Sequence, residues 1–337
     1  MKLDFEHRQS AHCESGVTSS LLRKDSGGKI TEPLAFGIGA GLFYVYVPLI
    51  KINNGPAIAF RTFPGLIFKR TCNALGIPVI RKKFSSRESA EKYLQERLDE
   101  GHPVGCQVGV YYLSYFPREY RFHFNAHNLI VYGKEDDNYL ISDPVMETTT
   151  SLTSYELERV RFAKGALAPK GQLYYPKDTG EITDEQIRKA IISGIKNNVN
   201  QMLRIPGNFA GVRGIKYTGE KIKKWRDKLG LQKAGLYLAQ LVRMQEEIGT
   251  GGGGFRYIYA AFLQEAYAYL QKEELLEISK KFTAAGDLWR TAAVQAAGIY
   301  KGRIGSQKDF DQMGDYLIEI SVLEKEAFTA LKSIKWQ

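Results

Sequence analysis

Cysteine is scarce in this chain, which has only three among its 337 residues: Cys13, Cys72 and Cys106. An odd number of cysteines cannot pair completely, and no two of them form a Cys-x-x-Cys motif. The first residues, MKLDFEHRQS, also lack the apolar stretch of a secretory signal. These absences exclude a disulfide-stabilised scaffold and predict a reducing, cytoplasmic compartment.

Long apolar segments are missing as well. The one candidate for a membrane span is an uncharged run of eighteen residues from Pro33 to Ile50. A spanning helix needs roughly 20 apolar residues, and the prolines and glycines of this run would leave backbone groups unsatisfied in lipid. We therefore expect a buried loop followed by a strand, and no membrane partner.

Metal-binding patterns are absent too. The five histidines form no His-Glu-x-x-His or His-x-x-x-His group, and no cysteine pair accompanies them, so we expect no metal site. Acidic residues are in deficit, because 37 Asp and Glu against 47 Lys and Arg give a formal net charge of +10. The excess favours contact with an acidic partner, and the lack of any nucleic-acid-binding motif argues against nucleic acid.

What is present is an ordinary globular composition, with 44% hydrophobic and 25% charged residues. Residues 1–175 combine segments with helical spacing, at about 13–24, 63–75 and 85–100, with three consecutive strand-like runs at 103–113, 127–133 and 138–144. From residue 183 onwards the apolar spacing is almost wholly helical. The sequence thus predicts an α+β protein, in which a domain over 1–175 contains an antiparallel sheet and a domain over 176–337 is all-helical.

Cys13 follows the polar segment EHRQSAH and is expected to open the first helix. At a helix N-terminus, unpaired backbone N–H groups and the helix dipole favour a thiolate and bind a developing oxyanion. A catalytic nucleophile is one interpretation of Cys13, and a buried small apolar residue is the other. We adopt the second interpretation for Cys72, in a predicted helix, and for Cys106, in a predicted strand.

A histidine and an aspartate that suit such a cysteine lie on a predicted hairpin. If the hairpin is centred on position 135, opposed residues have numbers that sum to 270, as His127 and Asp143 do. Opposed side chains share a face, so the carboxylate would orient the imidazole and stabilise its protonated form. His123 and Glu147 also sum to 270, but Pro144 is expected to end the strand first. Alternatively, His127 caps a strand edge and Asp143 belongs to an Asp-Pro turn.

The segments AHCESGVTSSLL, EPLAFGIGAGLFYVY and VYYLSYFPREYRFHFNAHNLIVYG, together with YLISDP, resemble the N-terminal domain of the butirosin-biosynthesis acyltransferase family. The resemblance covers about residues 5–165. The remainder, which contains GTGGGGFRYIYAAFLQEA, is similar to the domain that follows in that family. A papain-like cysteine-peptidase fold is implied for the first domain, with a helical domain that covers its cleft.

The activity implied by this resemblance is transfer of an (amino)acyl group from the phosphopantetheine thioester of an acyl carrier protein to an amine of a small molecule, such as an aminoglycoside in antibiotic biosynthesis. Cys13 would be the nucleophile, His127 the general base and acid, and Asp143 the residue that orients His127. No resident cofactor is implied, because phosphopantetheine arrives on the donor.

The oxyanion hole departs from the papain-like pattern, which usually places a glutamine about six residues before the cysteine. This chain has His7 there, and Gln9 stands four residues before Cys13. Gln9, His12 and Gly39 are the oxyanion and cleft candidates, beside the backbone N–H of Cys13. Gly39 belongs to a Gly-Ile-Gly-Ala-Gly run that has no strand before it and no helix after it, which argues against a nucleotide loop and leaves a cleft wall or a close-packed turn.

Seven basic and two acidic residues between Arg213 and Lys228, here called the basic segment, give a net charge of +5 over sixteen residues. The segment is either a dock for an acidic carrier protein or a solvated basic face. The carrier-binding candidates are Lys221, Lys223, Lys224, Lys228 and Arg256. Arg256 follows the run Gly251–Gly254, which is either a phosphate-binding helix start or a flexible joint.

The residues alone leave two other functions open. One is a cysteine peptidase or amide hydrolase with the same triad, since hydrolysis and aminolysis differ only in whether water is excluded from the site. The other is a non-catalytic binding protein on a papain-like scaffold.

Overall fold

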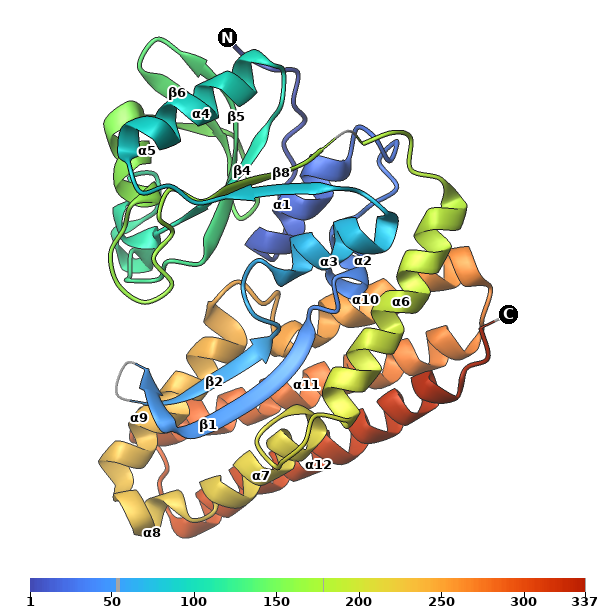
Figure 1. The fold of residues 1–337 in the computed structure, drawn as a ribbon. Helices are drawn as coiled ribbons and strands as arrows, with labels where there is room; N and C mark the ends of the chain where they lie inside the picture. The colour runs from blue at the N-terminus through green and yellow to red at the C-terminus, as the bar shows by residue number, and fades with distance from the viewer. Residues whose placement is uncertain (53–54, 178, 337) are drawn as a thin grey trace. The chain divides into compact units, whose positions relative to one another are not determined.

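The structure, a computed structural model, describes residues 1–52, 55–177 and 179–336. Contacts between Cα atoms divide the chain into two units, and each unit combines two separate stretches of sequence. The first unit consists of Met1–Ala35 and Ile67–Gln186, and the second of Phe36–Leu66 and Ile187–Gln337 (Figure 1).

This division differs from the predicted boundary between residues 175 and 176. Residues 36–66 are grouped with the second unit, because the hairpin of β1 (Leu42–Ile52) and β2 (Gly55–Arg61) packs on helices of that unit. The rings of Tyr44 and Phe60 lie 5.9 and 5.0 Å from the ring of Trp289, between centroids. Residues 53, 54, 178 and 337, which the predicted domains include, lie outside the described residues.

An antiparallel sheet forms the centre of the first unit, with the strand order β3-β8-β4-β5-β6-β7 in the described part of the chain. Its strands are β3 (Val79–Lys82), β4 (Val104–Val108), β5 (His127–Glu135), β6 (Asn138–Ser142), β7 (Thr150–Thr153) and β8 (Leu173–Pro176). The three predicted strands are confirmed as β4, β5 and β6. The first of them ends earlier than expected, because residues 110–112 form a short 3-10 helix.

Helices cover both faces of this sheet. On one face, α4 (Arg87–Asp99) and α5 (Ser154–Arg161) bury apolar side chains such as Leu94 and Leu157 against β4 and β5. On the other face lies α1 (Cys13–Leu22), which begins at the predicted residue (Figure 1). Two further helices are α2 (Glu32–Ile38) and α3 (Leu66–Leu75). α3 starts three residues later than predicted, because Pro64 and Gly65 form a turn in which Gly65 has a φ of +84°.

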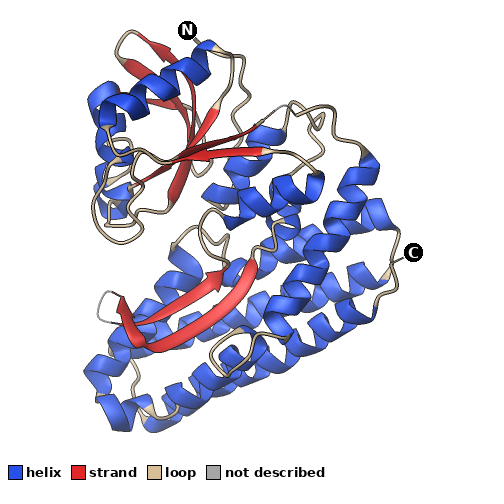
Figure 2. Cartoon of the chain, in the orientation of Figure 1, coloured by secondary structure: helices blue, strands red, loops and turns tan. Residues whose placement is uncertain are grey.

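Helices dominate the second unit, as predicted (Figure 2). They are α6 (Asp184–Leu203), α7 (Gly211–Ile222), α8 (Trp225–Leu229), α9 (Leu231–Val242), α10 (Arg256–Leu270), α11 (Glu274–Tyr300) and α12 (Gln307–Ser333). The antiparallel β1–β2 hairpin is tied to α6, where the Asn198 amide donates to the carbonyl of Leu42 at 2.6 Å. The structure thus confirms a mixed α and β class with antiparallel sheets and a helical C-terminal region.

The uncharged run from Pro33 to Ile50 lies in α2, a turn at Gly39 and Ala40, and most of β1. The expected loop is therefore largely a short helix. Its glycines allow close packing, since a Cβ on Gly37 would lie 2.1 Å from the ring of Phe262. Across the described ranges, no helix is both long and apolar enough to cross a membrane.

Candidate active site

The N-terminus of α1 holds Cys13 in place through the residues on either side of it. His12 is the N-cap, and its Nδ1 accepts a hydrogen bond from the backbone N–H of Ser15 at 3.4 Å. Both oxygens of the half-buried Glu32 carboxylate are used, because Oε1 accepts from the N–H of His12 at 2.7 Å and Oε2 from the N–H of Ala11 at 3.0 Å. Burial raises the pKa of Glu32, against the effect of these hydrogen bonds. Cys13 itself is 7% exposed.

His127 and Asp143 meet as the sequence suggests. His127 Nε2 lies 2.7 Å from Asp143 Oδ2, and both side chains are buried. The imidazole of His127 also shares a hydrogen bond with the side chain of Cys13. Since Nε2 faces Asp143, Nδ1 is the ring nitrogen left for the thiol. The first unit therefore brings Cys13, His127 and Asp143 together, with the imidazole of His127 between the thiol and the carboxylate.

The predicted register that led to this pair is wrong. The hairpin turns at Asp136 and Asp137, so Glu135 is opposite Asn138, and Ile130 is opposite Ser142 after a β-bulge. Asp136 has the positive φ of +52° that a two-residue hairpin turn needs. The residue numbers of the opposed pairs next to the site therefore sum to 272 instead of the predicted 270. A shift of two residues keeps the face of each side chain, so Asp143 still reaches His127 as a diagonal neighbour.

The charge state of the pair follows from its surroundings. Burial by itself would lower the pKa of His127, but the charge and hydrogen bond of Asp143, together with Cys13, raise the pKa to about 10. Asp143 accepts further hydrogen bonds from the Tyr115 hydroxyl at 2.7 Å and from the backbone N–H of Val145 at 3.2 Å. Burial and the neighbouring carboxylate raise the pKa of Tyr115 well above its usual range. His127 is therefore an imidazolium at neutral pH, beside a carboxylate and a thiol.

Asn128 is a second polar side chain at the cysteine. Its Nδ2 donates to Cys13 Sγ at 3.8 Å and to the carbonyl of Ala126 at 3.1 Å. Its Oδ1 accepts a hydrogen bond from the hydroxyl of Tyr174 on β8, at 2.8 Å. No sequence pattern singles out Asn128, Tyr115 or Glu32. The only available signal was that Asn128 directly follows the candidate histidine.

The other candidates have different surroundings in the structure. Gln9 is exposed, and His7 is bonded to Ser142 Oγ at 2.8 Å and to the carbonyl of Met146 at 3.1 Å. Gly39 is buried in the turn after α2 and is grouped with the second unit. The rival histidine, His123, is exposed and stacks on Tyr111 with ring centroids 4.1 Å apart.

The remaining two cysteines are buried, as expected. Cys72 lies in α3, where burial raises its pKa to about 12, and Cys106 lies in β4, where burial also raises its pKa. No cluster of three or more His, Cys, Asp or Glu side chains that would suit a metal ion occurs within the described residues.

The basic segment forms α7 and α8 with a break at Lys223 and Lys224, instead of one helix across these residues. Lys224 and Lys228 are exposed. Lys223 pairs with Asp315 at 2.5 Å, and the Lys221 ammonium lies 4.7 Å above the ring of Tyr217. Two of the four lysine candidates thus already have partners within the second unit.

Arg256 does not suit a carrier-binding role, because its side chain is fully buried. It forms two hydrogen bonds with Glu324, at 2.8 and 2.9 Å, and one with the carbonyl of Gly254 at 2.7 Å. A guanidinium that is paired in this way is not exposed to an anion from solution.

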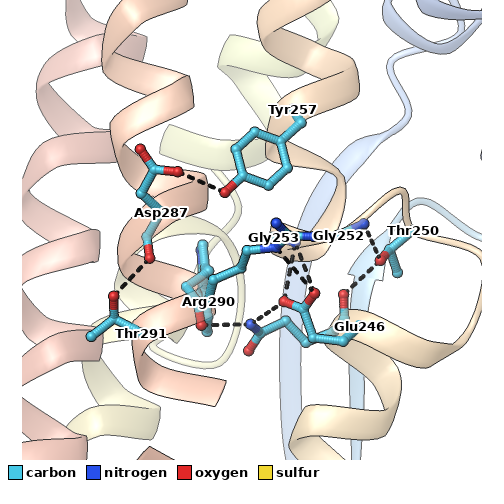
Figure 3. A network of polar contacts seen from close by, with 10 residues as sticks. Glu246, Thr250, Gly252, Gly253, Tyr257, Asp287, Arg290 and Thr291 are labelled. Carbon is cyan, nitrogen blue, oxygen red and sulfur yellow. Dashed lines mark hydrogen bonds and ion pairs between the residues drawn. The ribbon is translucent and has the colours of Figure 1, made fainter. Parts of the chain in front are cut away.

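The glycine run before Arg256 is a packed turn, which corrects the expectation of a flexible joint. Residues 251–255 all have positive φ, and Gly253 and Gly254 are buried. The Glu246 carboxylate accepts from the backbone N–H of Gly253 at 3.1 and 3.3 Å, and Thr250 Oγ1 accepts from that of Gly252 at 3.0 Å (Figure 3). The N–H group that a phosphate would use at Gly253 is thus bound to the chain's own carboxylate.

Comparison with protein-family models gives two matches. Residues 12–144 match the N-terminal domain of butirosin biosynthesis protein H, and residues 155–331 match a domain of unknown function, DUF4872. No curated protein matches the chain. The first match contains Cys13, His127 and Asp143, and it confirms the resemblance found in the N-terminal motifs. The DUF4872 match spans more than half of the chain, so the chain belongs to the DUF4872 family, and the residues before that domain match the N-terminal domain of butirosin biosynthesis protein H.

Proposed function

We propose that this protein is a cysteine-dependent acyltransferase, which moves an (amino)acyl group from an acyl-carrier-protein thioester through Cys13 to an amine acceptor in secondary metabolism. One observation carries the proposal: the His127 imidazole contacts both Asp143 and Cys13, at the N-terminus of α1. The match to butirosin biosynthesis protein H supports a role in antibiotic biosynthesis. A papain-like arrangement belongs to the same proposal, since the cysteine helix packs on an antiparallel sheet that carries the histidine.

In the acylation half, the Cys13 thiolate attacks the carbonyl carbon of the donor thioester and forms a tetrahedral intermediate. The raised pKa of His127 favours an imidazolium beside that thiolate before the attack. When the intermediate collapses, the bond to the carrier's sulfur breaks, and His127 gives its proton to the leaving thiolate. The products are an acyl group on Cys13, a neutral imidazole and the free carrier thiol.

In the transfer half, the acceptor amine attacks the acyl group on Cys13, and His127 takes a proton from the amine. The bond between the acyl carbon and Cys13 Sγ then breaks, so the amide leaves and the thiolate–imidazolium pair returns. Asp143 stabilises the charged imidazole in both halves, and the Tyr115 hydroxyl holds the carboxylate. Phosphopantetheine enters on the donor, so the proposal needs no resident cofactor.

Water in place of the amine would yield a carboxylic acid, which is the reaction of a cysteine peptidase or amide hydrolase. The test is therefore a single-turnover reaction of an acyl-loaded carrier protein with and without an aminoglycoside, with the products separated by mass spectrometry. We expect the amide to form when the amine is present. Carboxylic acid as the sole product at every amine concentration would favour the hydrolase, and an unchanged acyl-carrier would contradict both reactions.

Variants connect this reaction to the site. Cys13→Ala should abolish transfer, and Asp143→Asn should lower its rate while the fold stays intact, because the side chain keeps its shape. His127→Ala should lower the rate far more than the matched control His123→Ala, since His123 is exposed and stacks on Tyr111. Equal losses in the two histidine variants would contradict the assignment of His127.

A further inference from the structure

We propose that the side-chain amide of Asn128 is a catalytic oxyanion donor, which hydrogen-bonds the carbonyl oxygen of the acyl group while that oxygen carries negative charge. This inference rests on the proposed acyl transfer through Cys13. It supplies a side-chain donor of the kind that a papain-like site takes from a glutamine, whereas Gln9, the glutamine nearest to Cys13 in the sequence, is exposed.

The position of Asn128 relative to the sulfur fits this role. Asn128 Nδ2 lies 3.8 Å from Cys13 Sγ, and the side chain is only 3% exposed. The oxygen of an acyl group on Sγ lies one bond beyond the carbonyl carbon. An amide nitrogen at this distance from the sulfur is therefore near enough to the position of that oxygen to act as an oxyanion donor, for which the required distance is roughly 2.7–3.1 Å.

The orientation of the amide is fixed before any substrate binds. The Tyr174 hydroxyl donates to Asn128 Oδ1 at 2.8 Å, and one N–H of Nδ2 is directed to the carbonyl of Ala126 at 3.1 Å. The remaining N–H is the one directed to Cys13. Because the carbonyl of Ala126 can only accept a hydrogen bond, the atom that faces it is the amide nitrogen, which leaves Oδ1 for the Tyr174 hydroxyl.

Tyr174 is in turn held by packing, which makes it a positioning residue. Its ring lies 4.7 Å from the ring of Phe68, between centroids, and passes over Gly105 on β4. A Cβ on Gly105 would lie 2.6 Å from the tyrosine ring, so the glycine leaves room for it. Donors held in advance stabilise a transition state more than donors that must reorient.

Several other polar groups before the cysteine hydrogen-bond other partners. The backbone N–H groups of Ala11 and His12 donate to Glu32, and both ring nitrogens of His7 contact groups next to β6. The backbone N–H of Cys13 is the donor expected from the sequence. With Asn128 it would complete the pair of donors that oxyanion holes commonly contain.

The test compares two reactions of the same sulfur in wild type and in Asn128→Ala. Acylation by a small acyl-pantetheine thioester passes through an oxyanion, whereas alkylation by iodoacetamide displaces iodide at a CH₂ group and forms none at the attacked carbon. We expect single-turnover acylation to fall by about 10²- to 10³-fold, while alkylation, which loses only the long 3.8 Å contact between Nδ2 and the sulfur, slows far less.

Tyr174→Phe is the second variant, because it keeps Asn128 and removes only the hydrogen bond that orients the amide. Its acylation should fall by less than that of Asn128→Ala, again with a smaller effect on alkylation. Unchanged acylation in Asn128→Ala would overturn the inference and leave the acyltransferase proposal intact. Equal losses of acylation and alkylation would also overturn it, since Asn128 would then act on the thiolate. If wild-type protein is alkylated but not acylated by any thioester, the proposed function itself fails, and the inference fails with it.

Discussion

At the scale of single residues, the three cysteines differ in their surroundings. Burial raises the pKa of Cys72 to about 12 and also raises that of Cys106, and no histidine in the described ranges contributes to either shift. Cys13 lies at a helix N-terminus and shares a hydrogen bond with His127, which is protonated at neutral pH. An adjacent positive charge favours the thiolate, which is the reactive form.

We therefore predict that Cys13 is the first cysteine to react with iodoacetamide at neutral pH. Brief labelling of native protein, followed by peptide mapping, measures the modified fraction at each of the three positions. Labelling of Cys72 or Cys106 while Cys13 stays unmodified would contradict the assignment of the nucleophile.

The pKa of His127 is a second quantity that the site determines. The Asp143 carboxylate raises it to about 10 against the effect of burial, so replacing the charge with a neutral amide in Asp143→Asn should move the pKa well below 10. Titration of the Cε1–H signal of His127 by NMR measures this pKa directly. An unchanged midpoint for His127 would show that Asp143 does not set its charge state.

The sequence revealed the residues of the site that have distinctive chemistry and missed those whose role depends on contacts. A cysteine, a histidine and an aspartate near strand and helix ends indicate catalysis by type and spacing. Asn128, Tyr115 and Glu32 have no such signature, because an asparagine, a tyrosine or a glutamate has many uses in a protein. Their roles follow from hydrogen bonds between residues that are far apart in the sequence.

At the scale of elements, local chemistry predicted strands better than turns. β4, β5 and β6 follow from β-branched and apolar runs, but the two-residue turn and the bulge that set the register of β5 and β6 do not. The run Gly251–Gly254 shows the same limit. Four glycines are typical of a linker, whereas here the positive φ values serve a turn that is packed against Phe60 and bound to Glu246.

We predict that Gly254→Ala destabilises the protein more than Gly302→Ala. Both glycines have positive φ, of +57° and +71°, so each substitution costs about 1–2 kcal/mol in backbone strain. A Cβ on Gly254 would also lie 2.5 Å from the buried ring of Phe60, whereas one on Gly302 would meet nothing within 4 Å. Overpacking should add about 2 kcal/mol at Gly254. Denaturation in urea measures both free energies of unfolding, and equal losses would contradict the packed turn.

At the scale of the whole molecule, the division into two units is the feature that sequence composition could not reveal. Composition changes once along the chain, near residue 175, while each unit is assembled from two separate stretches. Residues 36–66 join the second unit through contacts such as those of Tyr44 and Phe60 with Trp289. Contacts of this kind link residues that are more than two hundred positions apart, so local patterns do not predict them.

Net charge is a property of the whole molecule, and it yields a further prediction. An acidic carrier protein should be attracted to the exposed lysines of the basic segment, an effect that salt screens over about 8–10 Å. Replacing Lys224 and Lys228 with glutamine should slow turnover of a carrier-bound donor and reduce its dependence on salt. Turnover of a free acyl-pantetheine thioester should stay close to wild type.

The matched control for this prediction removes the same charge elsewhere, at Lys308 and Lys332, which are also exposed. Replacing Lys308 and Lys332 should slow turnover of the carrier-bound donor less than replacing Lys224 and Lys228 does. Identical responses of the two variants would show that only net charge matters, and identical responses of the two donors would show that the basic segment does not bind the carrier.

In the proposed reaction, Cys13 carries the acyl group between donor and acceptor. Intact-protein mass spectrometry detects this intermediate after the protein is mixed briefly with an acyl-loaded carrier and no amine. We expect wild-type protein to gain the mass of one acyl group, which peptide mapping locates on Cys13 and which added amine removes as an amide, whereas Cys13→Ala should gain none. An acyl group on another residue, or acylation of Cys13→Ala at the wild-type rate, would show that Cys13 is not the nucleophile.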